Sequence, residues 1–300
     1  METKLGKYMK QFSTIGIFSK NGNEESNKSI KKTLQTLHDF LHQEGFKIVA
    51  ERNAASFLGI PEMDTNKFCD CINLAIVVGG DGTLLKAGRL LSDKDIPVIG
   101  INLGRLGFLV DISPDEIAEQ LTLMLNGAYT LEERSLLHAE AFRNGESLGE
   151  GIALNDVVVH VRNDIRMIEF TTHVDDTFVN TQRADGIVVA TPTGSTAYSL
   201  SGGGPILHPG LDAVVLVPIC PHTLSNRPIV ISNDSQINIS LCESREVNAR
   251  VSFDGQANID LRAGDSIVIR NKSHKLKLMH PENYDYYHIL RNKLGWSSSP

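Results

Sequence analysis

The stretch that decides the fold is Leu74-Ala-Ile-Val-Val-Gly-Gly-Asp-Gly-Thr83. Its five apolar, mostly β-branched residues predict a buried strand. Three glycines then flank one carboxylate, Asp81, before a run over 84–91 with helical spacing of leucines. Glycine lets backbone N–H groups approach phosphate oxygens, and a helix N-terminus favours negative charge. The stretch therefore predicts a phosphate-binding loop made by Gly79, Gly80, Gly82 and Thr83.

Asp81 is the unexpected residue of this loop, because a carboxylate repels phosphate unless it holds a metal ion or takes a proton. An aspartate between glycines can be only a turn residue. The strand before Asp81 and the helix after it favour a chemical role instead. A hydroxyl is too weak an acid to be ionised beforehand by a carboxylate. We therefore expect Asp81 to accept a hydroxyl proton late in a phosphoryl transfer, as the new bond forms.

Composition narrows the class of protein. The 300 residues suffice for one large domain or two medium ones, and the net charge of -7 without a basic block argues against nucleic-acid binding. No apolar run approaches the ~20 residues that span a bilayer, which argues against a membrane partner. The N-terminus lacks the apolar core of a signal peptide, and four sparse cysteines indicate reduced thiols. These features predict a cytoplasmic protein.

The first part of the chain alternates strands and helices. Strands are expected at 14–18, 46–50, 74–78 and 96–101. Helices are expected after the first, third and fourth of them, and a less regular, partly polar stretch follows the second up to Asp70. This order predicts a Rossmann-like α/β domain, a parallel sheet covered on both faces with ligands at the carboxyl ends of its strands. A second glycine-bearing loop, 102–107, follows such an end.

After about residue 131 strand-like runs follow one another, the last of them at Lys275–Met279. Asn144-Gly145 and Asp254-Gly255 are turn signals between such runs. We therefore expect an antiparallel β-sandwich after the α/β domain. A helical run from Tyr284 to Leu294 closes the chain. The predicted boundaries are 1–132 with 283–300 for the α/β domain and 133–282 for the all-β domain.

Asn155-Asp156 lies directly before an apolar run, Val157 to Val161. An Asx turn before a strand explains this pair without any function. As a site, asparagine offers both donor and acceptor to a base edge, and aspartate accepts from sugar hydroxyls.

The most distinctive segment runs from Asp185 to Pro205. Its Pro192 and its closing glycines are typical of a loop and need no function. A loop does not explain why many hydroxyl side chains surround one tyrosine, Tyr198, in a chain that is only 6% aromatic. We expect Tyr198 to stack on or flank an adenine, and the turn over 196–201 to bind polar atoms.

Together these motifs resemble the NAD kinase family, closest to its bacterial type. The resemblance rests on Gly79–Thr83, Asn155-Asp156, Asp185-Gly186, the run Thr191–Pro205 and Asp254-Gly-Gln256, which occur in the family's order. Further likeness lies in Pro221–Ser225, His280–Tyr286 and Lys293–Trp296, so that the resemblance covers nearly the whole chain.

The resemblance implies ATP-dependent phosphorylation of the adenosine-ribose 2′-hydroxyl of NAD, giving NADP and ADP. It makes Asp81 the proton acceptor. It also implies a divalent cation, Mg²⁺ or Mn²⁺, without a dedicated protein cage, and a homodimer or homotetramer. By the same resemblance the NAD-binding residues are Asp81, Gly82, Asn155, Asp156, Arg166, Arg183, Asp185, Thr196, Ala197, Tyr198, Ser199, Leu200, Ser201 and Gln256.

Several of these residues have a simpler interpretation. Arg166 and Arg183 suit phosphate as bidentate donors, yet surface arginines are usually solvated. Gln256 follows a hairpin-like turn in which Asp254-Gly255 needs no function. His222 lies in a family-like stretch, and without that context a structural histidine explains it.

Two other functions remain open from the sequence. Lipid kinases of the diacylglycerol type carry a similar glycine-Asp-glycine loop, but they would be expected to show an apolar acceptor cleft or a membrane-facing surface. A non-catalytic dinucleotide sensor would need the binding residues without the proton acceptor. All the expected site residues are present, Asp81 included, which argues against the sensor.

Overall fold

The chain divides into two compact units. The computed structural model describes residues 11–22, 27–162, 167–243 and 248–296. The first unit is Met1–Glu133 with Leu276–Pro300, and the second is Arg134–Lys275. Each unit has its own hydrophobic core. No helix among the described residues is long and apolar enough to cross a bilayer.

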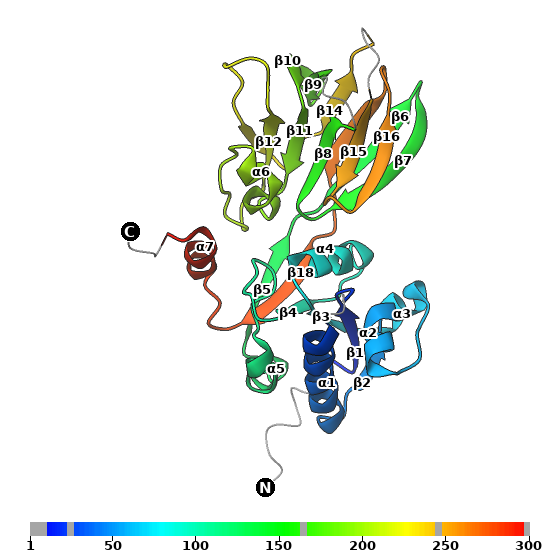
Figure 1. Cartoon of the computed structure of the whole chain (residues 1–300), viewed down its shortest axis with the longest axis vertical. Helices are drawn as coiled ribbons and strands as arrows, with labels where there is room; N and C mark the ends of the chain where they lie inside the picture. Colours follow the sequence, from blue (N-terminus) through cyan, green and yellow to red (C-terminus); the bar gives the residue numbers. More distant parts are fainter. Residues whose placement is uncertain (1–10, 23–26, 163–166, 244–247, 297–300) are drawn as a thin grey trace. The chain divides into compact units, whose positions relative to one another are not determined.

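The first unit contains one six-stranded sheet in the order β2-β1-β3-β4-β18-β5 (Figure 1). The pairs β2–β1, β1–β3, β3–β4 and β4–β18 are parallel. The strands are β1 (Thr14–Ser19), β2 (Lys47–Ala50), β3 (Leu74–Val78), β4 (Val98–Ile101), β5 (Tyr129–Arg134) and β18 (Leu276–Pro281). The helices are α1 (Asn27–Gln43), α2 (Arg52–Leu58), α3 (Thr65–Cys71), α4 (Asp81–Leu90), the 3-10 turn η2 (Pro114–Glu116), α5 (Ile117–Leu125) and α7 (Tyr286–Leu294).

Helices cover both faces of this sheet, as the α/β prediction required. Ile15 and Ile17 of β1 pack into one core cluster with the apolar faces of α1 and α5. Phe18 points to the opposite face, where its ring lies 5.0 Å from that of Phe68 in α3. Strand neighbours alternate between faces, so one short strand contributes to two layers.

The placement of β18 corrects the sequence prediction. The strand at the end of the second half was expected in the all-β domain, yet Leu276–Pro281 lies between β4 and β5 in the first unit (Figure 1). Leu278 pairs in parallel with Val98. The periodicity of a sequence indicates that a strand forms, but it does not indicate which other strand it pairs with.

The second unit contains two six-stranded antiparallel sheets, β10-β9-β14-β17-β6-β7 and β13-β12-β11-β8-β15-β16. A single core cluster draws side chains from both sheets, which is the predicted sandwich. Its strands are β6 (Leu137–Arg143), β7 (Glu146–Ala153), β8 (Asp156–Val161), β9 (Ile168–Val174), β10 (Thr177–Ala184), β11 (Gly186–Ala190), β12 (Ala213–Ile219), β13 (Ile229–Ser232), β14 (Ile237–Leu241), β15 (Ala249–Phe253), β16 (Ala257–Leu261) and β17 (Ser266–Asn271). Between β11 and β12 lie the 3-10 turn η3 (Gly194–Thr196) and the single-turn helix α6 (Tyr198–Ser201).

The valine run of β8 is buried because both of its faces are covered. Val157 and Val159 belong to the core between the two sheets. Val158 faces the other way, into a smaller cluster that includes Leu207 from the segment after α6. Asp156 and His160 share the outer face with Val158, since side chains alternate along a strand.

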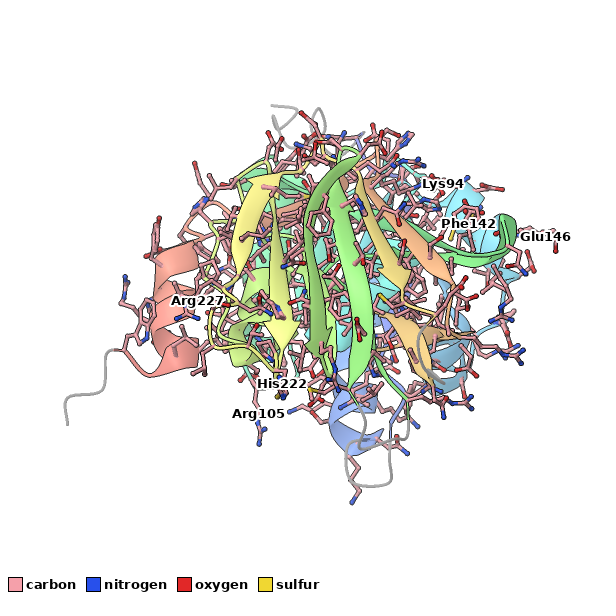
Figure 2. The ribbon with its side chains drawn as sticks, turned by 90° about the horizontal axis from the view of Figure 1, so that it is seen from above. Lys94, Arg105, Phe142, Glu146, His222 and Arg227 are labelled. Atoms are coloured by element: carbon pink, nitrogen blue, oxygen red, sulfur yellow. The ribbon has the colours of Figure 1, made fainter. Side chains whose placement is uncertain are left out.

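The predicted turns are confirmed by their backbone angles. Asn144 and Gly145 have φ of 51° and 82°, and Asp254 and Gly255 have φ of 50° and 63°. Two consecutive positive φ angles are typical of the two-residue hairpin turn, which Asn144 and Gly145 form between Arg143 and Glu146, whereas the connection at Asp254 and Gly255 has three residues. Figure 2 labels Phe142 and Glu146 on either side of the first of these turns.

Candidate functional site

Asp81 is the first residue of α4, directly after β3 and its two glycines. Its carboxylate is held by the loop that follows β4. The N–H of Phe108 donates to Oδ2 at 3.1 Å, and the N–H of Leu109 donates to Oδ1 at 2.9 Å. Each carboxylate oxygen keeps lone-pair capacity for a further partner. The two glycine loops predicted at neighbouring strand ends therefore meet at this side chain.

Two glycines allow these close approaches. A Cβ on Gly107 would collide with Oδ1 of Asp81, and a Cβ on Gly79 would collide with the hydroxyl of Thr83. Gly80 is the N-cap of α4 and has open space around it. Gly80 and Gly82 are exposed, so their backbone can be reached by a ligand.

The ligands available around Asp81 indicate how a divalent cation could bind there. Over the described ranges, no group of three or more His, Cys, Asp or Glu side chains could hold a metal ion. Mg²⁺ is usually bound by one or two carboxylates together with substrate phosphates and water. One carboxylate beside a loop that is predicted to bind phosphate fits a cation that arrives with a nucleotide.

The second unit contains a pocket of about 320 Å³ on the outer face of β8 and β15. It brings together four residues predicted for NAD binding, Asn155, Asp156, Ala197 and Tyr198. Tyr198 is 48% exposed, so its ring is free to flank a ligand. The pocket also contains Val158, His160 and Ser252, which the sequence did not indicate. Its remaining residues, Asp254 and Gly255, belong to a predicted turn and to a motif of the resemblance, but the sequence assigned them no contact with NAD.

Two predicted motifs are bonded to each other at this pocket. The Thr191 hydroxyl donates to the carbonyl of Leu154 at 2.6 Å, and the Thr191 N–H donates to the carbonyl of Asn155 at 2.9 Å. Gly194 packs so closely on Asn155 that a Cβ would collide with its backbone. The turn at 154–156 and the segment after β11 therefore form one rigid wall.

The hydroxyl side chains around Tyr198 have largely structural roles, which changes the sequence interpretation. The Ser195 hydroxyl donates to the carbonyl of Pro192 at 2.6 Å and accepts the N–H of Leu207 at 2.9 Å. The Thr196 hydroxyl donates to the carbonyl of Thr193 at 3.2 Å. The hydroxyl-rich composition mainly satisfies the backbone of a tight loop.

Asp156 is only 5% exposed, and its environment disfavours the charged form. Burial, and then the negative charge of Asp254, raise the pKa of Asp156 to about 7. A carboxyl group with such a pKa exchanges its proton near neutral pH. The pocket therefore contains an acid whose charge responds to small changes in its surroundings.

His160 lines the same pocket in its neutral form. Burial lowers its pKa, a hydrogen bond to the carbonyl of Val161 opposes that shift, and the charge of Arg250 adds to it. Nδ1 lies 2.7 Å from the Val161 carbonyl oxygen, which only accepts, so Nδ1 carries the proton. Nε2 lies 2.9 Å from the hydroxyl of Ser252. No sequence motif marks His160, and only its place on the outer face of β8 could have indicated it.

The remaining predicted residues lie outside the set that lines this pocket. Arg183 and Asp185 flank the step from β10 to β11. The carbonyl of Arg183 accepts the N–H of His222, whose side chain is exposed, and Figure 2 labels His222 in the segment after β12. Gln256 is exposed after the β15–β16 turn. Arg166 lies outside the described residues.

The side chains of the turn over 196–201 differ in their exposure to solvent. Ser201 is exposed, whereas Ser199 is fully buried. The Ser199 hydroxyl lies so close to Gly204 that a Cβ there would collide with it. The Ser199 side chain therefore faces the protein interior.

Comparison with known proteins identifies both halves of the chain. A family model described as the ATP-NAD kinase N-terminal domain matches residues 9–129. A second, described as the ATP-NAD kinase C-terminal domain, matches residues 154–281. The chain is 46% identical over 294 residues to a protein of Hahella chejuensis named NAD kinase, covering 97% of this chain and 98% of that protein.

Two solved structures share the fold. Yeast NADH kinase complexed with NADH aligns with a TM-score of 0.87 and 24% identity, over 97% of this chain and 89% of that one. An NAD kinase from Archaeoglobus fulgidus in complex with ATP aligns with a TM-score of 0.72 and 24% identity, over 94% and 97%. The α/β unit and the antiparallel sandwich thus occur together in both.

Proposed function

This chain belongs to the NAD kinase family, and we propose how its two units divide the reaction between them. It is a phosphotransferase that uses ATP to phosphorylate NAD. The acceptor is the adenosine-ribose 2′-hydroxyl, and the products are NADP and ADP. The first unit supplies the phosphate loop and the proton acceptor, and the second unit supplies most of the dinucleotide contacts.

Asp81 accepts the proton of the 2′-hydroxyl. The bond from the γ-phosphorus of ATP to its bridging oxygen breaks, the 2′-oxygen bonds to that phosphorus, and the hydroxyl proton passes to Asp81. The observation that carries this role is the carboxylate held by the N–H groups of Phe108 and Leu109 at the start of α4. Two donors from a neighbouring loop hold its oxygens in one orientation, and positioning is the main requirement of phosphoryl transfer.

The phosphate contacts come from the backbone of the loop after β3. Exposed glycines and the N-terminus of α4 favour the negative phosphates of ATP. Asp81 is the carboxylate that would hold a divalent cation, Mg²⁺ or Mn²⁺, which would supply neutralisation of the phosphate charge when bound with ATP. The phosphate-binding residues are Gly79, Gly80, Gly82 and Thr83.

The dinucleotide is bound by the wall that joins the turn at 154–156 to the segment after β11. Asn155 and Asp156 bind polar atoms of the adenosine, and the exposed ring of Tyr198 flanks its base. Ser199, whose side chain faces inward, takes part through its backbone. The other proposed contacts are Asp81, Gly82, Arg166, Arg183, Asp185, Thr196, Ala197, Leu200, Ser201 and Gln256.

A product assay tests this function against its two rivals. The purified chain is incubated with ATP, Mg²⁺ and NAD, and NADP is measured with an NADP-specific dehydrogenase. We expect NADP and ADP in equal amounts and no phosphorylation of diacylglycerol vesicles. Lipid phosphorylation without NADP would identify a lipid kinase, and NAD binding without turnover would identify a sensor.

We also propose a homodimer or homotetramer that acts in the cytoplasm. Multi-angle light scattering of the purified chain should give two or four times the 32.9 kDa of one chain. A monomer at enzyme concentrations used in the assay would contradict this assembly. Cell fractionation should recover the activity in the cytosolic fraction, and recovery with membranes would contradict the location.

A further inference from the structure

The turn at 154–156 depends on one side chain from a distant hairpin. Oδ1 of Asp254 accepts the N–H of Asn155 at 2.8 Å and the N–H of Asp156 at 3.3 Å. Oδ2 of Asp254 accepts the N–H of Leu154 at 3.1 Å. The N–H of Asp254 in turn donates to the carbonyl of Asp156 at 3.0 Å. One residue therefore bonds three successive residues of the dinucleotide wall.

The hairpin itself does not require a carboxylate at this position. Asp254 and Gly255 have positive φ angles in the three-residue connection between β15 and β16, and asparagine adopts such angles as well as aspartate does. Three backbone donors converging on one ionised group make a stronger and more specific clamp than neutral hydrogen bonds do. The hairpin accounts for the positive φ angle of Asp254. The three backbone N–H donors account for a carboxylate at this position.

We propose that Asp254 is a positioning residue for the dinucleotide, which fixes Asn155 and Asp156 and places a second negative charge beside Asp156. The proposal rests on the proposed function, in which Asn155 and Asp156 contact NAD. Asp254 acts through these two residues and has no required contact with NAD.

The charge of Asp254 beside Asp156 should affect how NAD binding depends on pH. Burial is the largest cause that raises the pKa of Asp156, and Asp254 is the second. The other titratable groups lining the pocket are His160, on the same strand, and Tyr198, on the facing segment. Removing the charge of Asp254 lowers the pKa of Asp156. Ionised Asp156, which accepts hydrogen bonds from NAD, then persists to lower pH.

The test compares Asp254→Asn with a matched turn aspartate. Asp175 also has φ of 50°, accepts the N–H of Gln236 through Oδ1 at 2.8 Å and donates its own N–H to the Gln236 carbonyl. Asp175→Asn therefore makes the same chemical change in a hairpin outside the pocket. Calorimetry measures the dissociation constant of NAD for the full chain between about pH 5 and 9, on both sides of the pKa of Asp156.

We expect Asp254→Asn to weaken NAD binding about tenfold at neutral pH, the loss of one charge-assisted bond to the backbone. The acid side of its affinity profile should move to lower pH than in the unsubstituted chain. Asp175→Asn should change neither quantity. Asp254→Ala, which removes all three acceptors, should weaken binding further, and circular dichroism shows whether it folds.

Each other outcome has a defined meaning. If Asp254→Asn binds NAD like the unsubstituted chain, the clamp is overturned. If binding weakens while the acid side of the profile stays in place, the charge coupling to Asp156 is overturned. If the unsubstituted chain binds no NAD, the proposed function fails before Asp254 is tested. Asp254→Asn decides the proposal even where Asp254→Ala does not fold.

Discussion

Asp81 and Asp156 have the same side chain in opposite surroundings. Asp81 begins a helix, is half-buried, and receives two backbone N–H groups. Asp156 begins a strand, is 5% exposed, and has the charge of Asp254 beside it, so that its pKa rises to about 7. In the proposed reaction the first receives a proton from the substrate, whereas the pKa of the second lies near neutral pH. The environment, rather than the residue type, separates the two roles.

The largest expected effect is the fall in kcat when Asp81 is substituted. Asp81→Asn keeps the shape of the side chain and cannot accept a proton, so kcat should fall ~10²–10⁴-fold while the NAD dissociation constant changes little. Steady-state kinetics and calorimetry measure the two quantities. The control is Asp64→Asn at the N-cap of α3, where the carboxylate also accepts two backbone N–H groups and asparagine caps equally well. Unchanged kcat in Asp81→Asn would remove Asp81 from the mechanism.

The raised pKa of Asp156 predicts a pH-dependent stability. Between the ordinary value of 3.8 and about 7 the folded chain keeps the proton and the unfolded chain loses it. The free energy of unfolding contributed by this group is therefore full below that interval and is lost as the pH rises through it. Asp156→Asn does not titrate, so its stability relative to the unsubstituted chain should rise across the interval by up to ~4 kcal/mol.

Urea unfolding of both chains at the two ends of that interval measures the difference. A difference that does not change with pH would show that Asp156 titrates normally in the folded chain.

Thr191→Val tests the wall to which Asp156 belongs. Thr191 is fully buried, and its hydroxyl joins Leu154 to Gly194. Valine leaves both of those backbone groups unpaired, which should cost about 1–3 kcal/mol and weaken NAD binding by a few-fold. Thr172→Val is the control, since Thr172 is 1% exposed and its hydroxyl has no hydrogen-bond partner in the described part of the chain. Equal losses of stability in both variants would contradict the role of the hydroxyl.

The last prediction concerns the close approach of Gly107 to Asp81. Gly107→Ala places a Cβ against Oδ1, and the displaced carboxylate should lower kcat about tenfold with an unchanged NAD dissociation constant. Gly210→Ala is the control, because its nearest neighbour lies 3.3 Å from the added atom. Normal kcat in Gly107→Ala would show that Asp81 tolerates the shift.

The sequence indicates local structure at the site better than contacts between distant residues. An apolar run followed by glycines predicts β3, its loop and α4, because those signals are adjacent in the chain. The N–H groups that hold Asp81 come from residues 27 and 28 positions away and leave no mark in side-chain composition. Asp254 was explained by its turn alone, and its bonds to the wall span about a hundred positions. Backbone N–H donors, which every residue type except proline has, leave no pattern in the sequence.

Short elements and sheet partners were also missed. The helices α2 and α3 have seven residues each, too few for an apolar period to stand out. Both depend on their N-caps, Glu51 and Asp64, whose side chains accept backbone N–H groups. The strand at 276–281 was recognised as a strand, but its pairing with β4 was not.

That pairing has a consequence for the order in which the protein is made. Five strands of the first sheet are complete when synthesis reaches Arg134, yet β4 and β5 are not neighbours in the sheet, because β18 lies between them. All twelve strands of the sandwich are synthesised before that gap can be filled. The first unit is therefore the first to be synthesised but can be completed only after the sandwich has been made. No nascent chain that ends before residue 276 contains β18, the strand that joins β4 to β5.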